Sequence, residues 1–326
     1  MPTIKPSNSP ATNSMAGQKA KGAQQTTKGA QQTKGILLMI AGMAILPMLD
    51  ASAKWLGQTL PASEVSAGRF IIQMALLLPF LYLLGHRLSW QSFSRNEAAR
   101  GFCLAIATWL FFVALKSLPM AEAISIFFVE PMILTLLASL LLGERIRIRR
   151  ISAILIGFVG AVIVIQPSFD IFGWPALLPL GTAFFFALYM IITRIQAQVK
   201  HPIESQISMS VFALLTILIL ASLNHQTGLE AQGWRMPNMQ EILVICLLGA
   251  TATTGHIMVV FALQRADAGL LAPFQYLEVV TASLLGYLIF NDIPSNTTIA
   301  GVTIIIGSGL YLIHRERRAS LQDEFA

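Results

Sequence analysis

Two acidic residues, Glu130 and Glu278, lie near the middle of long apolar stretches of the sequence. The stretch around the first, residues 114–144, is long enough to cross a lipid bilayer. A charged side chain at the centre of a membrane costs about 2.5–3.5 kcal/mol even on a lenient scale, so such residues are generally functional. These acids are therefore candidates to bind a ligand or to carry a coupling proton, and both roles require the same residue type.

Pro131 follows Glu130 directly and predicts a break in the helix at this depth. Proline has no backbone N–H, so it cannot donate to the carbonyl of Phe127, four residues earlier. A carbonyl released in this way is tolerated inside a membrane where it faces a cavity or a ligand. Pro47, in the first apolar run, and Pro273, in the later stretch, are predicted to break their helices in the same way.

Asp50 and Lys54 lie four residues apart in the first apolar run, so their side chains can pair along one helix face. One interpretation is an ion pair that only neutralises two buried charges, or a lysine that extends to the membrane surface. The other is that both residues face a cavity and contact a ligand. Glu64 and Arg69, which open the second run, are either interfacial charges or contacts for a gate or an anionic substrate.

Aromatic side chains gather near these acids in the apolar runs. Rings in membrane spans usually face lipid or the protein core, but rings grouped around buried acids can line a pocket for a flat ligand. His256 is a lone histidine, interpreted as a buried core residue rather than a proton relay. The candidates to line a pocket for a flat ligand are Trp109, Phe127, Tyr189, Gln275 and Tyr276.

The sequence lacks the motifs of several other classes of protein. It has no G-x-x-x-x-G-K-[ST], no H-E-x-x-H, no G-x-S-x-G and no His, Cys and Asp set at metal-ligand spacing. We therefore expect neither an ATP-driven pump nor an enzyme, and no metal or cofactor. Of the 326 residues, 55% are hydrophobic and 12% charged, which indicates an integral membrane protein. The net charge of +6 resides in tails and short loops, so nucleic-acid binding is not expected.

Ten apolar runs predict ten transmembrane helices in an all-α protein that contacts the lipid bilayer. Residues 1–34, rich in Lys, Gln and Thr, are predicted to form a disordered cytoplasmic tail, and residues 315–326 a second cytoplasmic tail. Turn residues separate the runs. The runs lie near residues 35–57, 61–85, 98–117, 119–142, 150–167, 173–195, 205–223, 240–263, 268–290 and 296–314.

The second half of the chain resembles the first. Glu278 follows Glu130 by 148 residues, and residues around the two acids match with the same offset. We therefore predict two repeats of five helices each, residues 35–167 and 173–314. Lys and Arg are concentrated in segments that share one side of the membrane if both termini are cytoplasmic. Because each repeat has an odd number of helices, the second repeat is then inverted, with a central cavity between the halves.

Residues 114–150, with the span that follows, resemble the EamA repeat of the drug/metabolite transporter superfamily, and the resemblance covers nearly everything after the tail. Residues 35–57 and 272–301 resemble a narrower subset, the bacterial inner-membrane importers of riboflavin and of S-adenosylmethionine. The family implies ten helices, inverted halves and a central cavity. The residues that fall on the pattern of the subset are Asp50, Lys54, Glu130, Pro131 and Glu278.

The second repeat departs from the general family pattern in two places. Val279 follows the acid where the family has proline, and Asn291-Asp292 stands where it has Gly-Glu. The departure favours the importer-like subset and weakens any transfer of function from amino-acid exporters. The motifs specify the fold more closely than the substrate.

The resemblance implies a secondary carrier that works by alternating access, with riboflavin as the best-supported cargo. A neutral flat heterocycle with a polyol tail suits aromatic faces and polar groups such as Gln275, Tyr276 and Asp50. S-adenosylmethionine is cationic and would use Glu130 and Glu278 more directly, so it or another amphipathic metabolite is the alternative cargo. Import or export, and coupling to protons, stay open. The alternative of another class is a membrane scaffold subunit that transports nothing.

Overall fold

The computed structural model describes residues 10–83, 85, 92–142, 148–196, 202–227, 233–266, 271 and 274–324. Within these residues the chain is helical apart from turns and short connections, and it forms no β-strand. A short 3₁₀ turn, Trp174–Leu177, precedes α7. The α-helices are α1 (Pro10–Leu56), α2 (Ala62–Leu83), α3 (Arg95–Ser117), α4 (Met120–Phe127), α5 (Glu130–Leu142), α6 (Ile148–Phe172), α7 (Leu178–Gln196), α8 (Pro202–Thr227), α9 (Met239–Arg265), α11 (Leu277–Phe290) and α12 (Asn296–Glu324).

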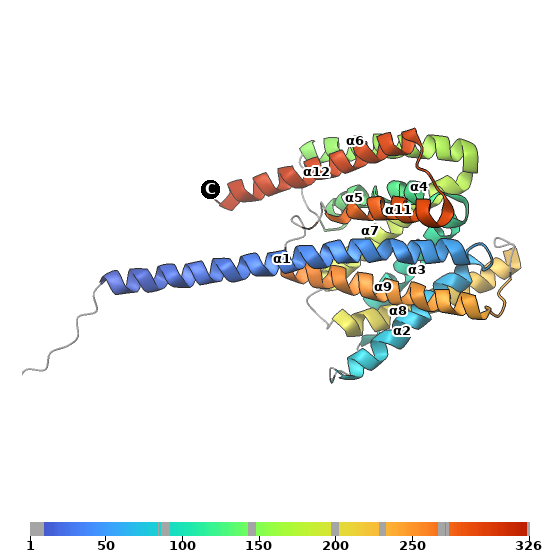
Figure 1. The fold of residues 1–326 in the computed structure, drawn as a ribbon, viewed down its shortest axis with the longest axis horizontal. Helices are drawn as coiled ribbons and strands as arrows, with labels where there is room; N and C mark the ends of the chain where they lie inside the picture. Colours follow the sequence, from blue (N-terminus) through green and yellow to red (C-terminus); the bar gives the residue numbers. More distant parts are fainter. Residues whose placement is uncertain are drawn as a thin grey trace, which may run out of the picture.

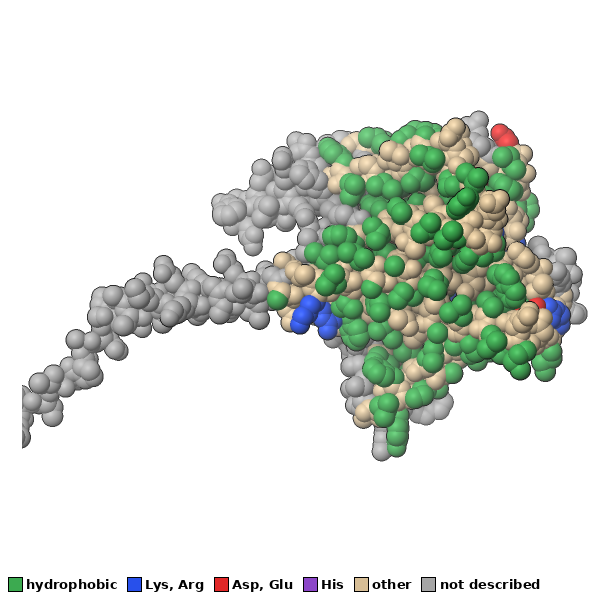
Figure 2. All heavy atoms as spheres, viewed as in Figure 1, with side chains coloured by type: hydrophobic (Ala, Val, Ile, Leu, Met, Phe, Trp, Pro, Cys, Tyr) green, Lys and Arg blue, Asp and Glu red, His purple; other side chains and the backbone are tan. Residues whose placement is uncertain are grey.

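Eight spans among the described residues are long and apolar enough to cross a membrane. α4 and α5 together make one of these, Met120–Leu141. α11 and the segment Asn296–Ser308 of α12 are apolar but shorter. Figure 2 shows apolar side chains over the middle of the visible face, with charged side chains near its two ends. The chain is therefore a multi-pass, all-helical membrane protein.

α3 and α9 begin with the same kind of cap. The hydroxyl of Ser94 accepts a hydrogen bond from the N–H of Glu97 at 3.4 Å, and the side-chain oxygen of Asn238 accepts one from the N–H of Glu241 at 2.9 Å. Each cap satisfies an N–H that has no partner within its own helix. The caps fix the start of both helices, and with it the position of two buried glutamates.

The helices form a bundle with α6 and α12 together on one edge and α2 and α8 on the other (Figure 1). Between these edges, α1 packs against α9 and α11, and α7 packs against α3 and α5. α2 also contacts α9, α8 also contacts α3, and α4 contacts α11. The carboxyl end of α12 and the amino-terminal part of α1 extend from the bundle on the same side (Figure 1).

α6 and α12 are antiparallel and approach closely at small residues. A Cβ on Gly157 would meet the hydroxyl of Ser308 at 2.9 Å, and a Cβ on Gly160 would meet the carbonyl of Gly301 at 2.9 Å. Gly157 thus faces a later residue of α12 than Gly160 does, so the two helices run in opposite directions. α4 and α11 are also antiparallel, because Met120 lies against Gly286 while the far end of α4 meets the start of α11.

The two predicted tails are helical over their described residues. α1 begins at Pro10, and α12 continues to Glu324, so helix replaces the disorder expected over residues 10–34. The physical reason is that adding residues to an existing helix avoids the cost of nucleation, and Ala, Gln and Lys propagate a helix well.

The prediction that Pro47 breaks its helix is wrong, since α1 runs through this residue without interruption. Proline removes one backbone hydrogen bond, and the packing of α1 against α9 and α11 holds the remaining turns in place. Pro273 lies outside the described residues.

Candidate functional site

The helix that crosses the membrane at Glu130 is interrupted just before this residue. α4 ends at Phe127 and α5 begins at Glu130, with Phe128 and Val129 between them. Phe128 has φ −66° and ψ 3°, which leaves the α-helical path. Met132 donates to the carbonyl of Val129, three residues back, at 3.0 Å. The break places the carboxyl group of Glu130 at the amino end of a half-helix inside the bundle.

α11 begins with a similar break near Glu278. Tyr276 has φ −65° and ψ −12°, and the N–H of Val279 donates to its carbonyl at 3.2 Å. The ring of Tyr276 stacks on the ring of Phe128, with centroids 5.3 Å apart and planes inclined by 34°. Such a pair adds about 0.5–1.5 kcal/mol beyond the apolar area that it buries. The two breaks therefore meet, and each has an acid within two residues.

Asp50 of α1 and Arg69 of α2 join these acids in one charged group. Asp50 interacts electrostatically with Arg69 and with Glu278, and Arg69 also with His256. Glu130 interacts in the same way with Tyr276. Asp50 and Arg69 are 6% and 5% exposed, so both side chains are enclosed by the protein.

Lys54 does not pair with Asp50. Its ammonium group forms a short ion pair with Asp292, and donates to the carbonyl of Leu118 at 3.1 Å. It also lies 5.0 Å from the ring centroid of Phe290. The predicted pairing along one helix face is wrong because tertiary partners at the end of α1 outcompete the neighbour four residues away. Lys54 therefore joins α1 to the chain beyond α11.

A continuous series of aromatic contacts leads from Tyr276 to Tyr189. Phe128 contacts Phe127 at 6.1 Å between centroids, Phe127 contacts Phe186 at 5.5 Å, and Phe186 contacts Tyr189 at 5.4 Å. Arg69 interacts electrostatically with Tyr189. Through Tyr189 of α7, the aromatic series therefore reaches Arg69 of the charged group.

The structure brings most of the predicted site residues together. Glu130, Glu278, Asp50, Tyr276, Tyr189 and Phe127 belong to the charged group or the aromatic series. Trp109 packs against the hydrophobic core near Tyr189, and Gln275 is half-buried beside Tyr276. Among the described residues, no three or more His, Cys, Asp or Glu side chains are placed to hold a metal ion.

One face of α2 carries polar atoms that lack partners among the described residues. These atoms are Ser66 Oγ, Arg69 Nε and Gln73 Oε1, and all three side chains are buried. Arg69 does donate through Nη1 to Thr108 Oγ1 at 2.6 Å. Glu130 Oε1 is a fourth buried atom that meets no donor within the described chain. An unmatched buried polar atom costs about 1–3 kcal/mol, so three such atoms on one face of α2 indicate a place where a ligand could supply the missing partners.

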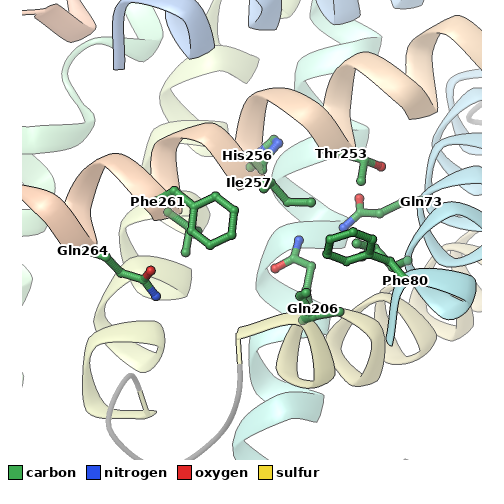
Figure 3. A pocket seen from close by; sticks show the side chains of 11 residues that line it. Gln73, Phe80, Gln206, Thr253, His256, Ile257, Phe261 and Gln264 are labelled. Carbon is green, nitrogen blue, oxygen red and sulfur yellow. The ribbon is translucent and has the colours of Figure 1, made fainter. Parts of the chain in front are cut away.

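A cavity of about 310 Å³ lies between α2, α8 and α9, near the lower end of the range of about 300–1,000 Å³ for small-molecule sites. Figure 3 shows Gln73 of α2 and Gln206 of α8 pointing into it, with Thr253 and His256 of α9 at its border. None of the predicted site residues is among the described residues that line it. The remaining lining residues are Leu77, Phe80, Ile203, Ile257, Val260, Phe261 and Gln264.

Sequence reasoning missed Ser66 and Gln73. Both occur in an otherwise apolar helix and, with Arg69, follow the spacing that places residues on one helical face. This one-face spacing could have identified Ser66 and Gln73 as candidate site residues from the sequence. His256 was interpreted as a core residue, and its Nδ1 does contact the carbonyl of Ala252 at 2.7 Å, but the ring also lines the cavity.

Glu241 ties together one end of the bundle. Its carboxylate accepts from Thr59 Oγ1 at 2.7 Å and from Arg235 Nη1 at 3.0 Å. The backbone N–H of Arg235 donates to Glu64 at 3.3 Å, and the indole of Trp234 donates to Ser63 at 2.9 Å. The hydrogen bond with Glu241 raises the pKa of Arg235, which keeps this loop residue charged. The connection before α9 is thus fastened to the α1–α2 turn.

Glu97 has the corresponding place at the start of α3. It accepts from Arg100 Nη1 at 2.9 Å and from Ser205 Oγ at 2.6 Å, and Arg100 Nε donates to Thr193 at 3.0 Å. Ser92 forms a short hydrogen bond with Glu204. Because the carboxyl end of α3 lies near Lys54 at the end of α1, this second network is at the opposite end of the bundle.

The chain matches the model of the EamA-like transporter family twice, over residues 33–166 and 173–314. Similar curated proteins include an S-adenosylmethionine uptake transporter of Rickettsia bellii, 29% identical over 83% of this chain and 90% of that protein. A riboflavin transporter of Rhizobium johnstonii is 26% identical over 91% of this chain and 98% of that protein. A riboflavin transporter of Vibrio cholerae is 29% identical over 81% of this chain and 87% of that protein.

A solved crystal structure has a TM-score of 0.60 to this chain, at 20% identity, and covers 86% of this chain and 97% of its own. At this identity the likeness concerns the fold alone. The family resemblance expected from residues 114–150 is confirmed by the family model.

The ion pair between Lys54 and Asp292 gives a testable prediction. Replacement of Lys54 by Met leaves the Asp292 carboxylate without its partner, and Asp292→Asn leaves the ammonium group without its own, so each variant should lower the melting temperature in detergent. In the double variant the losses should be less than additive, with a coupling of about 0.5–3 kcal/mol. Strictly additive losses would contradict a direct pair.

Proposed function

Because this chain belongs to the EamA-like transporter family, we propose that it is a secondary transporter that moves a small metabolite across the bacterial inner membrane by alternating access. Ten transmembrane helices form two inverted repeats, residues 35–167 and 173–314, and both termini are cytoplasmic. The observation that carries this proposal is the stack of Phe128 on Tyr276, where two similar helix breaks meet beside their acids.

The repeat offset supports the equivalence of these breaks. Phe128 and Tyr276 are 148 residues apart, as are Glu130 and Glu278, and the two ring-bearing residues have nearly the same φ and ψ. Equivalent residues contact each other where a twofold axis passes between two copies of a unit. The stack is therefore what a pseudo-twofold axis through the breaks would produce.

The packing of the helices supports inversion. When α1, α2, α3 and α6 are exchanged for α7, α8, α9 and α12, the contact of α1 with α9 becomes that of α7 with α3. The contact of α2 with α8 and that of α6 with α12 map onto themselves. α6 and α12, which are equivalent in this exchange, are antiparallel. An axis that relates antiparallel helices lies in the plane of the membrane, as in inverted-repeat transporters.

The two glutamate networks support alternating access. Glu97 and Glu241 are both third residues of capped helices, and each accepts a hydrogen bond from the other half of the chain, Glu97 from Ser205 and Glu241 from Thr59. Two similar hydrogen-bond networks at opposite ends of the bundle could act as gates that break one after the other. The binding site would then be accessible from one side of the membrane at a time. The cargo then binds at the buried charged group between them.

Riboflavin is the cargo that the site favours. The half-helices α5 and α11 already carry acids in their first turns, so their amino ends do not require an anionic ligand. The aromatic series from Tyr276 to Tyr189 offers ring faces to a flat heterocycle, and relatives named as riboflavin transporters align over most of the chain. The polar residues Gln275 and Asp50 suit the polyol tail.

S-adenosylmethionine is the second candidate. Asp50 interacts electrostatically with Glu278, and Glu130 does so with Tyr276, two residues before Glu278, so these acids would attract a sulfonium cation. Relatives named as S-adenosylmethionine uptake transporters have identities similar to those named for riboflavin. Arg69 opposes this choice, because its guanidinium group interacts electrostatically with Asp50 and would repel a cation. In either case, Glu130 and Glu278 are the groups that a proton would occupy if transport is coupled to protons.

Uptake of labelled riboflavin by liposomes that contain the purified protein tests the cargo. We expect saturable uptake that excess unlabelled riboflavin abolishes and that excess S-adenosylmethionine leaves unchanged. Liposomes without protein are the control. Inhibition by S-adenosylmethionine, with labelled S-adenosylmethionine taken up instead, would reverse the order of the two cargoes, and uptake of neither compound would contradict both.

Conversion of either buried acid to its amide tests the site. Glu130→Gln and Glu278→Gln keep the side-chain size, and each should lower the initial rate of uptake by roughly tenfold to a hundredfold, as for loss of one hydrogen bond to a charged group. Asp170→Asn, which alters an exposed acid of α6, should transport at the normal rate. Normal uptake by both glutamate variants would instead fit a scaffold with incidental acids.

A further inference from the structure

We infer that the cavity between α2, α8 and α9 receives the lactam edge of the cargo, a ring carbonyl beside a ring N–H, and that Gln73 is the residue that selects it. The inference rests on the proposed riboflavin transport and assigns part of the ligand to a place in the fold. Lactam-edge recognition would be shared by any neutral heterocycle with this group, and riboflavin is the probe.

The amide oxygen of Gln73 is buried without a partner among the described residues. The side chain is 1% exposed, and its Oε1 accepts no hydrogen bond from the described residues. In a membrane span no water from the lipid side relieves such an atom. A leucine would fill the same space without this cost, so the glutamine is best explained by a donor that arrives with the ligand.

Two of the unmatched atoms on α2 have complementary hydrogen-bonding roles. Gln73 Oε1 is an acceptor that lacks a donor, and Arg69 Nε, one helical turn earlier, is a donor that lacks an acceptor among the described residues. Residues four apart on a helix lie on the same face. Of these two atoms only the acceptor belongs to a residue that lines the cavity, so Gln73 would receive the N–H of a lactam, and the C=O is left to the amide of Gln206.

The walls of the cavity combine amide groups with apolar side chains. Gln206 points into the space from α8, facing Gln73 (Figure 3), and provides a second amide with a donor and an acceptor. Phe80 and Phe261 line the cavity and give it apolar walls beside the two amides. The described lining residues include no Asp, Glu, Lys or Arg, so the cavity offers no counter-ion to a charged ligand.

His256 adds an acceptor at the border of the cavity. Its Nδ1 lies 2.7 Å from the carbonyl of Ala252, and a carbonyl can only accept, so Nδ1 carries the hydrogen. A neutral ring then presents Nε2 as an acceptor. Together with Gln73 and Gln206, this gives the ligand amide and imidazole partners rather than ionic ones.

The test compares two flavins on purified full-length protein in lipid nanodiscs, with binding followed by quenching of flavin fluorescence. One ligand is riboflavin, and the other is riboflavin methylated at ring N3, which loses the lactam N–H but keeps its ring, charge and polyol. Wild-type protein should bind the methylated flavin roughly tenfold more weakly, as for loss of a buried hydrogen bond.

Gln73→Leu should bind riboflavin as weakly as the wild type binds the methylated flavin, and should no longer distinguish the two ligands. Its melting temperature without ligand should equal or exceed that of the wild type, because an unmatched buried amide is removed. A purely structural glutamine would show a lower melting temperature instead. Gln58→Leu, at an exposed position, is the matched control and should keep the full preference for riboflavin.

The outcomes separate this inference from the proposed function. If the wild type binds both flavins equally, or if Gln73→Leu keeps the preference, the lactam assignment is overturned while flavin binding stands. If the wild type binds neither flavin, the proposed cargo fails, and the assignment of its edge fails with it.

Discussion

Lipid offers no hydrogen-bond partner, so each polar group within a membrane span must find one inside the protein. Most polar side chains in the bundle meet this requirement locally, since hydroxyls such as those of Ser52, Thr135 and Thr253 donate to the carbonyl one turn earlier. Larger groups are matched across helices, as Glu122 is by Ser168 and Lys54 by Asp292. Against this background the unmatched atoms of the described chain, on Ser66, Arg69, Gln73 and Glu130, identify where a cargo is expected to bind.

The same constraint explains why the helix breaks lie where they do. Non-helical backbone at membrane depth is tolerated only where protein or a cavity surrounds it. The break at Phe128 is covered by Tyr276, and the break at Tyr276 is covered by Phe128. Each break therefore shields the other, and the acids that follow them are held at the contact between the two halves.

The sequence was sufficient for much of the fold. The apolar runs, the acid at each break and the family were all accessible from residues 35–314, because hydrophobic length and motif spacing are local properties. The partners of individual side chains were harder to predict from the sequence. Lys54 pairs with Asp292, 238 residues away, in preference to a neighbour four residues away, and a single sequence does not reveal such a partner. Gln73 was missed because one amide in an apolar helix becomes notable only when its lack of a partner is known.

Infrared difference spectroscopy on Glu130 tests most directly whether the unmatched groups serve the cargo. Spectra of the protein in lipid, recorded with and without riboflavin, report changes in the stretching bands of carboxyl side chains. If the cargo completes the hydrogen bonding of Glu130, riboflavin will shift a carboxyl band in the wild type, and this shift will be absent in Glu130→Gln but present in Asp170→Asn. Identical difference spectra for the wild type and Glu130→Gln would contradict the assignment of Glu130 to the transport site.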